Sequence, residues 1–152
     1  MIGVIDPGVR LAINKTNSQS IGVIGTHATI QSNSYGEKLK SISSKINIFN
    51  QSCPLFEPLF EEGLTECPIT KLIVESYLNH FKNPDIDTLI LGCTHYPILT
   101  AVIKDVVGKN ISLVDSGKAA AEVVMGVLKE NEILSGEPHG EVYSFITCLL
   151  YT

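Results

Sequence analysis

The residues best suited to chemistry in this sequence follow a short apolar run at residues 89–91. Gly92 ends the run, and Cys93, Thr94 and His95 come next, before a Tyr-Pro pair. The apolar run is typical of a buried parallel strand, and the proline favours the first turn of a helix. Ligands of open α/β sheets bind at the carboxyl ends of the strands, where these side chains are predicted to lie. Free N–H groups at the helix start would favour a carboxylate or phosphate there and lower the pKa of the Cys93 thiol.

Short apolar runs alternate with helical patterns along the chain, and this alternation gives the expected fold. Strands are expected at residues 1–5, 20–25, 46–49, 88–91, 111–114 and 142–146. Helices are expected at residues 35–42, in a short piece around 57–62, and at 68–83, 97–108 and 119–131. The helix from residue 68 is expected to have Ile69, Leu72, Ile73 and Tyr77 on one face. Residues 115–117 are expected to cap the helix at 119–131. The pattern predicts an α/β fold, a parallel sheet with helices on both faces.

Composition narrows the class of protein. A chain of 152 residues with 44% hydrophobic and 18% charged residues is typical of a globular domain with a sizeable core. A net charge of −5 argues against a nucleic-acid surface, so an anionic substrate would need local donors. We expect no signal peptide and no membrane contact, because no apolar segment approaches the roughly 20 residues of a span. The four scattered cysteines are expected to be free thiols of a reducing cytoplasm.

Each of these patterns also has a structural interpretation. Cys93 could be a buried structural cysteine beside a capping threonine, and Thr26 and Thr29 could be helix caps only. Three solvated carboxylates on a surface turn would equally explain Glu57, Glu61 and Glu62. A zinc site built from the cysteines and His95 is disfavoured, because the sequence has no Cys-x-x-Cys or His-x-x-x-His pair. Neither standard glycine-rich phosphate loop is present.

The run Gly-Cys-Thr-His-Tyr-Pro at residues 92–97, directly after an apolar strand, resembles the second catalytic motif of the glutamate racemases. The related aspartate racemases carry an acidic residue where this chain has His95, so the histidine favours glutamate. The resemblance implies cofactor-independent interconversion of L- and D-glutamate, which supplies D-glutamate for peptidoglycan, in the cytoplasm. It implies that Cys93 is the acid/base on one face of the α-carbon and that His95 tunes its proton.

Two further segments are similar to this family. Residues 53–63 resemble the segment whose glutamate assists the second cysteine, and the similarity assigns that role to Glu61. Residues 21–32 are similar to the loop that binds the substrate carboxylate, which implicates Thr26 and Thr29, together with Thr94 of the central motif. The resemblance implies no cofactor, because the thiols supply the proton chemistry, and the cysteine and histidine spacing predicts no metal. Full-length members commonly form homodimers, and the sequence assigns no interface.

The resemblance also sets the expected domain organisation. Glutamate racemases have two similar α/β halves with the site between them, and this chain resembles the second half. We expect residues 1–114 to form that domain, 115–147 to be a returning helix and strand that pack on the first half, and 148–152 to be a non-native tail. Two rivals remain, namely a related racemase or decarboxylase acting on another acid and a non-catalytic α/β module that binds a small anion or a partner.

Overall fold

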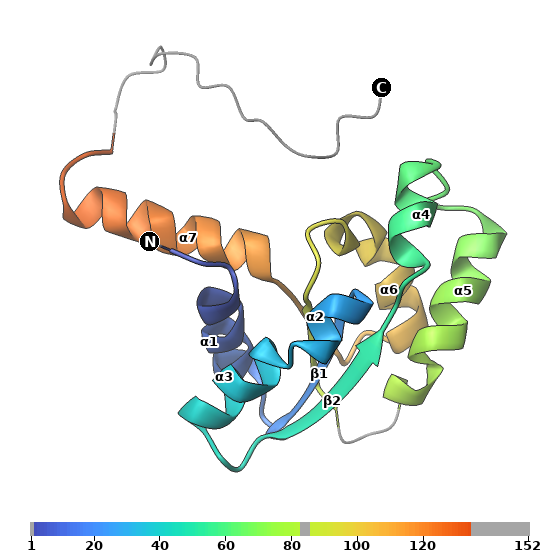
Figure 1. Ribbon diagram of the computed structural model, residues 1–152, viewed down its shortest axis with the longest axis horizontal. Helices are drawn as coiled ribbons and strands as arrows, with labels where there is room; N and C mark the ends of the chain where they lie inside the picture. Colours follow the sequence, from blue (N-terminus) through green and yellow to red (C-terminus); the bar gives the residue numbers. More distant parts are fainter. Residues whose placement is uncertain (1, 83–85, 135–152) are drawn as a thin grey trace.

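The computed structural model describes residues 2–82 and 86–134 and shows one sheet flanked by helices (Figure 1). Its four strands pair in parallel in the order β2-β1-β3-β4. The strands are β1 (Ser20–Gly25), β2 (Asn47–Ser52), β3 (Thr88–Leu91) and β4 (Ser112–Asp115). The helices are α1 (Ile5–Lys15), α2 (His27–Gln31), α3 (Ser34–Ile42), α4 (Phe56–Glu61), α5 (Pro68–Leu78), α6 (Thr100–Val107) and α7 (Ser116–Glu130), with the 3-10 turns η1 (Asn79–Lys82) and η2 (Tyr96–Leu99). The predicted α/β class is confirmed.

Two apolar cores lie on opposite faces of the sheet. One core is shared with α1 and α3, and the other with α5 and α6 (Figure 1). Side chains along a strand alternate between faces, so Ile90 enters the first core, whereas Leu89 and Leu91 enter the second. A strand covered on both faces is buried along its whole length, so after the polar first residues Ser20 and Thr88 both β1 and β3 consist of apolar residues and glycine, which makes them recognisable from the sequence.

The strand order fixes where a ligand can be bound. From β1 the chain passes to β2 on one side, and later crosses to β3 and β4 on the other side. The order therefore reverses between β1 and β3, and this gap at their carboxyl ends is the topological switch point of the sheet. The segments that follow β1 and β3 are the two predicted to carry site residues.

The strand predicted at residues 1–5 is wrong. Residues 2–4 are not part of the sheet, and α1 begins at Ile5. Val9 and Ala12 are fully buried on one face of α1 with Ile5 packed beside them, a helical spacing rather than an alternating one. Pro7 fits the first turn of the helix, where its missing N–H needs no partner.

The predicted buried face of α5 is wrong in part. Ile69 and Leu72 are 58% and 65% exposed, although Ile73 and Tyr77 do pack against the core. The buried stripe instead runs through Thr70, Val74 and Leu78, four residues apart. Thr70 can be buried because its hydroxyl donates a hydrogen bond to the Leu64 carbonyl.

The remaining differences lie at the ends of elements. β2 extends to Ser52, and α7 begins at Ser116, three residues earlier than expected. Asp115 caps α7 as predicted, because its carboxylate accepts hydrogen bonds from the N–H groups of Gly117 and Lys118. The strand predicted at 142–146 and the tail at 148–152 lie outside the described residues. No helix within the described ranges is long and apolar enough to cross a membrane.

Asp87 ties the amino end of the sheet together. Its carboxylate accepts hydrogen bonds from the Thr16 hydroxyl at 2.6 Å and from the N–H groups of Asn17 and Ser18 at 2.7 and 2.8 Å. The loop between α1 and β1 is thereby held against the start of β3. Burial by itself would raise the pKa of Asp87, but the hydrogen bonds outweigh it and lower the pKa to about 2.

We expect Asp87→Asn to lower the free energy of unfolding by about 1–2 kcal/mol at neutral pH, because a neutral amide loses the charge-assisted bonds and the site is partly exposed. The native carboxylate titrates near 2 and the unfolded one near about 3.9. Its contribution is thus complete above pH 4 and disappears as the pH falls towards 2. Urea denaturation at pH 7 and at low pH measures both effects, and a difference that persists at pH 2 would contradict the assignment. Glu66→Gln, at an exposed carboxylate, is the control and should change stability by less than about 0.5 kcal/mol.

Candidate active site

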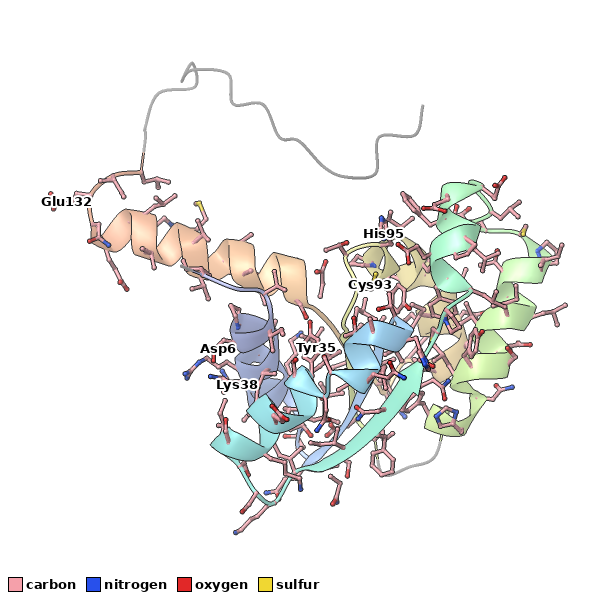
Figure 2. All side chains as sticks on the ribbon, viewed as in Figure 1. Asp6, Tyr35, Lys38, Cys93, His95 and Glu132 are labelled. Atoms are coloured by element: carbon pink, nitrogen blue, oxygen red, sulfur yellow. The ribbon has the colours of Figure 1, made fainter. Side chains whose placement is uncertain are left out.

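Each predicted site segment leaves the sheet at the same edge. Because β1 and β3 pair in parallel with Ile24 opposite Leu91, the residues after both strands emerge side by side. Thr26 follows β1 and Cys93 follows β3, on either side of the switch point. Figure 2 shows Cys93 and His95 together on the segment between β3 and α6. The Cys93 side chain is half-buried and the Thr94 side chain is exposed.

A thiol, an imidazole and a carboxylate form a row at this edge. The Sγ atom of Cys93 lies 3.8 Å from Nδ1 of His95, and the same Nδ1 lies 3.7 Å from Oε1 of Glu57. Helix α4 supplies Glu57 and also Phe60, whose ring centroid lies 4.9 Å from that of His95. The aromatic contact fixes the imidazole between the thiol and the carboxylate.

A single nitrogen, Nδ1 of His95, serves both neighbours, and this makes the row a proton switch. A neutral Nδ1 without hydrogen can accept the proton of the Cys93 thiol. A protonated Nδ1 can instead donate to the Glu57 carboxylate or to a Cys93 thiolate. His95 can therefore exchange a proton with the Cys93 sulfur. This needs only a small shortening of the present distances, as binding of a substrate would bring.

The predicted lowering of the thiol pKa is wrong. Burial raises the pKa of Cys93, and the negative charge of Glu57 adds to the rise, while the N–H groups of His95, Tyr96 and Thr94 act in the opposite direction. The expected helix field is weak because the motif leads into the single 3-10 turn η2, and α6 begins only afterwards. Cys93 is therefore a thiol, and not a thiolate, at neutral pH.

The threonines predicted to bind carboxylates lie beside this row. Thr26 caps α2, accepting a hydrogen bond from the N–H of Thr29 at 3.2 Å, and the two hydroxyl oxygens are 3.0 Å apart. Thr29 also packs towards Gly92, the residue before the thiol. Capping thus accounts for the Thr26 hydroxyl in this structure, and substrate contact by the threonines stays a prediction.

Glu61 is the predicted residue that the structure does not join to the row. It is exposed and makes no hydrogen bond or ion pair with any residue in the described ranges 2–82 and 86–134. Glu57 lies one helical turn earlier on α4 and contacts His95. The two carboxylates are four residues apart, a spacing that places them on one side of a helix, and this signal could have brought Glu57 into the predicted set.

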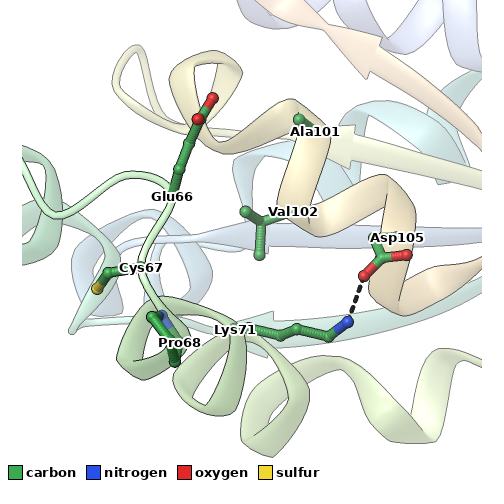
Figure 3. Close-up of a pocket in the computed structure, with 7 residues that line it drawn as sticks. All are labelled: Glu66, Cys67, Pro68, Lys71, Ala101, Val102 and Asp105. Atoms are coloured by element: carbon green, nitrogen blue, oxygen red, sulfur yellow. Dashed lines mark hydrogen bonds and ion pairs between the residues drawn. The ribbon is translucent and has the colours of Figure 1, made fainter.

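The other described cysteines differ from Cys93. Cys53 is fully buried after β2, and burial raises its pKa to about 12. Cys67 precedes α5 and lines a cavity of about 460 Å³ between α5 and α6, spanned by the ion pair of Lys71 and Asp105 (Figure 3). This cavity contains no residue of the Cys-Thr-His turn, so it is a separate feature. No group of three or more metal-ligating side chains gathers within the part of the chain that the structure describes.

Gly92 makes the close approach of β3 to β1 possible. Its N–H donates to the Ile24 carbonyl at 2.7 Å. A Cβ atom added at Gly92 would lie 2.8 Å from that carbonyl oxygen and 3.1 Å from the ring of Tyr35. The first distance is shorter than a carbon can occupy against backbone, so only glycine fits before Cys93.

The fold and the row of side chains define an α/β protein equipped for acid–base chemistry at a thiol. The family of Asp/Glu/Hydantoin racemases matches residues 1–124, and the chain belongs to this family. It is 44% identical over 139 residues to a glutamate racemase of Chlorobium phaeobacteroides and 46% identical over 147 residues to one of Persephonella marina. These matches cover 91% and 97% of this chain but 51% and 54% of the relatives. The chain therefore spans about half the length of the curated relatives it matches.

Solved structures agree with the sequence relatives. A glutamate racemase from Bacillus anthracis superposes with a TM-score of 0.82 at 38% identity, covering 89% of this chain and 51% of that one. A glutamate racemase from Francisella tularensis, solved in complex with D-glutamate, gives 0.80 at 35% identity over 90% of this chain and 50% of that one. An aspartate racemase from Picrophilus torridus, at 20% identity and 0.60, shares the fold.

The Gly92 packing predicts the outcome of one substitution and its control. Gly92→Ala should lower the free energy of unfolding by about 1–3 kcal/mol, because the methyl group must push β1 or Tyr35 away. Gly126→Ala is the matched control, since a Cβ there meets no atom within 4 Å. As α7 is helical, that change should raise stability by about 0.5–1 kcal/mol. Thermal denaturation of both variants measures the difference, and equal effects would contradict the packing argument.

A second experiment tests the electrostatics of the row. Glu57→Gln removes the negative charge that opposes the Cys93 thiolate, so the pKa of Cys93 should fall. The alkylation rate of Cys93 by iodoacetamide, followed by peptide mass spectrometry against pH, should show its midpoint at lower pH. Glu61→Gln is the same chemical change one turn later and should leave the midpoint nearly unchanged. A larger shift with Glu61→Gln would show that Glu61 is the carboxylate nearer the thiol in solution.

Proposed function

We propose that this chain is the portion of a glutamate racemase that bears one of its two catalytic cysteines. The parent enzyme would interconvert L- and D-glutamate and supply D-glutamate for peptidoglycan. The observation that carries the proposal is the row of Cys93, His95 and Glu57 at the switch point, in a chain whose relatives are glutamate racemases. The D-glutamate complex of the Francisella relative supports glutamate as the substrate.

The proposed reaction is proton exchange at the α-carbon, with no cofactor. In one direction, the thiolate of the cysteine in the other half of the enzyme takes the α-proton of one enantiomer. The C–H bond of the substrate breaks as an S–H bond forms on that cysteine. Cys93 then gives its thiol proton to the opposite face of the carbanion, which inverts the centre. A raised pKa suits this direction, since Cys93 begins as the protonated acid.

In the reverse direction Cys93 must lose its proton before it can act as a base. His95 lies 3.8 Å from the sulfur and can accept that proton or hydrogen-bond to the thiolate. Glu57, which contacts the imidazole, and Glu61, which resemblance to the family favours, are the candidate carboxylates that hold His95 in place. The hydroxyls of Thr94, Thr26 and Thr29 would bind the carboxylates of the substrate.

The domain organisation belongs to the same proposal. Residues 1–114 would form one half of the enzyme, and residues 115–147 would return to the other half. Helix α7 supports this, because it extends away from the sheet and its apolar residues Val123, Val124, Met125 and Val127 are 37–45% exposed (Figure 1). A cytoplasmic location and a homodimeric full-length enzyme complete the proposal.

A non-catalytic α/β module that binds a small anion is the second candidate, favoured by the threonine hydroxyls at the α2 start and by the raised thiol pKa. The two differ in one property that can be measured. A racemase exchanges the α-proton of glutamate with solvent, whereas a module binds an anion without exchange. A full-length enzyme that binds glutamate in NMR titrations but never exchanges its α-proton in D₂O would favour the module.

We expect the 152-residue chain alone to show no measurable racemisation, because one face of the substrate has no acid or base.

In the full-length enzyme, Cys93→Ala should lower the rate about 10²–10⁴-fold or more. Cys67→Ala is the matched control and should leave the rate unchanged. Circular dichroism of the substrate and incorporation of deuterium at the α-carbon follow the reaction. Racemisation by the isolated chain, or full activity of the Cys93→Ala enzyme, would contradict the proposal.

A further inference from the structure

Two buried hydroxyl groups link three elements directly behind the Cys93 turn. Tyr35 of α3 and Ser116, the first residue of α7, are each 4% exposed. The Tyr35 hydroxyl donates to Oγ of Ser116 at 3.0 Å. The Ser116 hydroxyl in turn donates to the carbonyl of Leu91, the last residue of β3, at 3.4 Å. We name this chain of hydrogen bonds, from Tyr35 through Ser116 to Leu91, the hydroxyl relay.

The relay ends on the peptide group that joins Leu91 to Gly92, the residue before Cys93. The Leu91 carbonyl and the Gly92 N–H belong to one peptide unit. Its carbonyl accepts from Ser116, and its N–H donates to the Ile24 carbonyl at 2.7 Å. Both polar groups of this planar unit are therefore bound, one by a side chain at the root of α7 and the other by β1. These two bonds help to hold the peptide at which the chain leaves β3 towards Cys93.

Packing leaves the relay little freedom. The ring of Tyr35 lies against Gly92, where an added Cβ would be 3.1 Å away. On the other side, a Cβ at Gly8 of α1 would lie 2.6 Å from Oγ of Ser116, so α1 closes directly over the serine. Figure 2 places Tyr35 between the α3 region and the segment that carries Cys93. Burial raises the pKa of Tyr35, so its hydroxyl keeps its proton and remains a donor across the physiological range.

We infer that Tyr35 and Ser116 are positioning residues for Cys93, acting through the peptide between Leu91 and Gly92. This inference rests on the proposed function only for its catalytic consequence, since the geometry concerns the thiol itself. Both hydroxyls are neutral, and no hydrogen bond joins either of them to the sulfur within the described residues. Their removal should therefore change how freely the thiol turn opens without changing the charge around it. This distinguishes the relay from Glu57, whose removal changes the charge near the sulfur.

The test measures the alkylation rate of each cysteine in the 152-residue chain by peptide mass spectrometry. In Tyr35→Phe the ring stays and only the hydroxyl is lost. The rate at Cys93 should rise about 2- to 10-fold, the equivalent of one lost hydrogen bond. The pH midpoint of the rate should stay where it is. Two other cysteines are internal controls. Fully buried Cys53 reports opening of the whole fold, and Cys67 is a partly exposed thiol away from the relay. The alkylation rates of both should remain unchanged.

Two further variants make the result decisive. Ser116→Ala should raise the Cys93 rate as Tyr35→Phe does, and the double variant should add little to Ser116→Ala, because both single changes break the same relay. Tyr77→Phe makes the same chemical change at a tyrosine whose hydroxyl has no hydrogen bond within the described residues, and it should leave the Cys93 rate unchanged.

Each outcome bears on the inference. An unchanged Cys93 rate in both relay variants would overturn it, and so would a Cys53 rate that rises in step with Cys93, which would make the relay a general stabiliser. In the full-length enzyme, Tyr35→Phe should lower kcat with little change in KM, since the thiol and not the substrate is misplaced. If racemisation fails even in the unmodified full-length enzyme, the proposed function is wrong, while the alkylation result still decides the positioning role.

Discussion

The close contact between Gly92 and strand β1 is the constraint on which the site depends. Strands β1 and β3 are adjacent in the sheet although strand β2 and several helices lie between them in sequence. The N–H of Gly92, directly after β3, donates a hydrogen bond to the Ile24 carbonyl of β1. A side chain at this position would collide with the Ile24 carbonyl, so the two strands can end together only if the residue before Cys93 is glycine. The thiol then stands at the switch point, beside the start of α2.

Burial, and not a helix field, governs the proton chemistry that this position allows. Burial and the nearby Glu57 carboxylate raise the pKa of the Cys93 thiol, so in the proposed mechanism Cys93 starts as an acid. His95 compensates for this asymmetry, because its Nδ1 lies between the sulfur and Glu57 and can bind either a thiol proton or a thiolate. In the proposed racemase each catalytic residue would be an acid in one direction and a base in the other, and His95 would serve Cys93 in both.

The sequence identified those parts of the molecule whose patterns are local. β1 and β3 are apolar at nearly every position because both faces are covered. Once these strands are recognised, the positions of the residues at their carboxyl ends are known as well. Other features depend on contacts between distant segments. Val9 and Ala12 of α1 reveal a helix only when the core they face is known, and α4 aims Glu57 at the imidazole because Phe60 packs on the His95 ring. The predicted lowering of the Cys93 pKa is wrong for the same reason, because burial is a property of the assembled fold and not of the motif.

The three described cysteines differ in position and in acidity, and the proposed catalytic thiol is assigned by its position. The hydroxyl of Thr70 lowers the pKa of Cys67, which makes it the most acidic of the three, whereas burial raises that of Cys53 to about 12. Acidity alone would therefore select Cys67, yet no imidazole contacts it within the described residues and it lies away from the switch point. Cys93 has a raised pKa, but it lies at the switch point with the His95 imidazole 3.8 Å from its sulfur. In this fold the sheet places the sulfur, and its burial, with a smaller contribution from the Glu57 charge, raises its pKa.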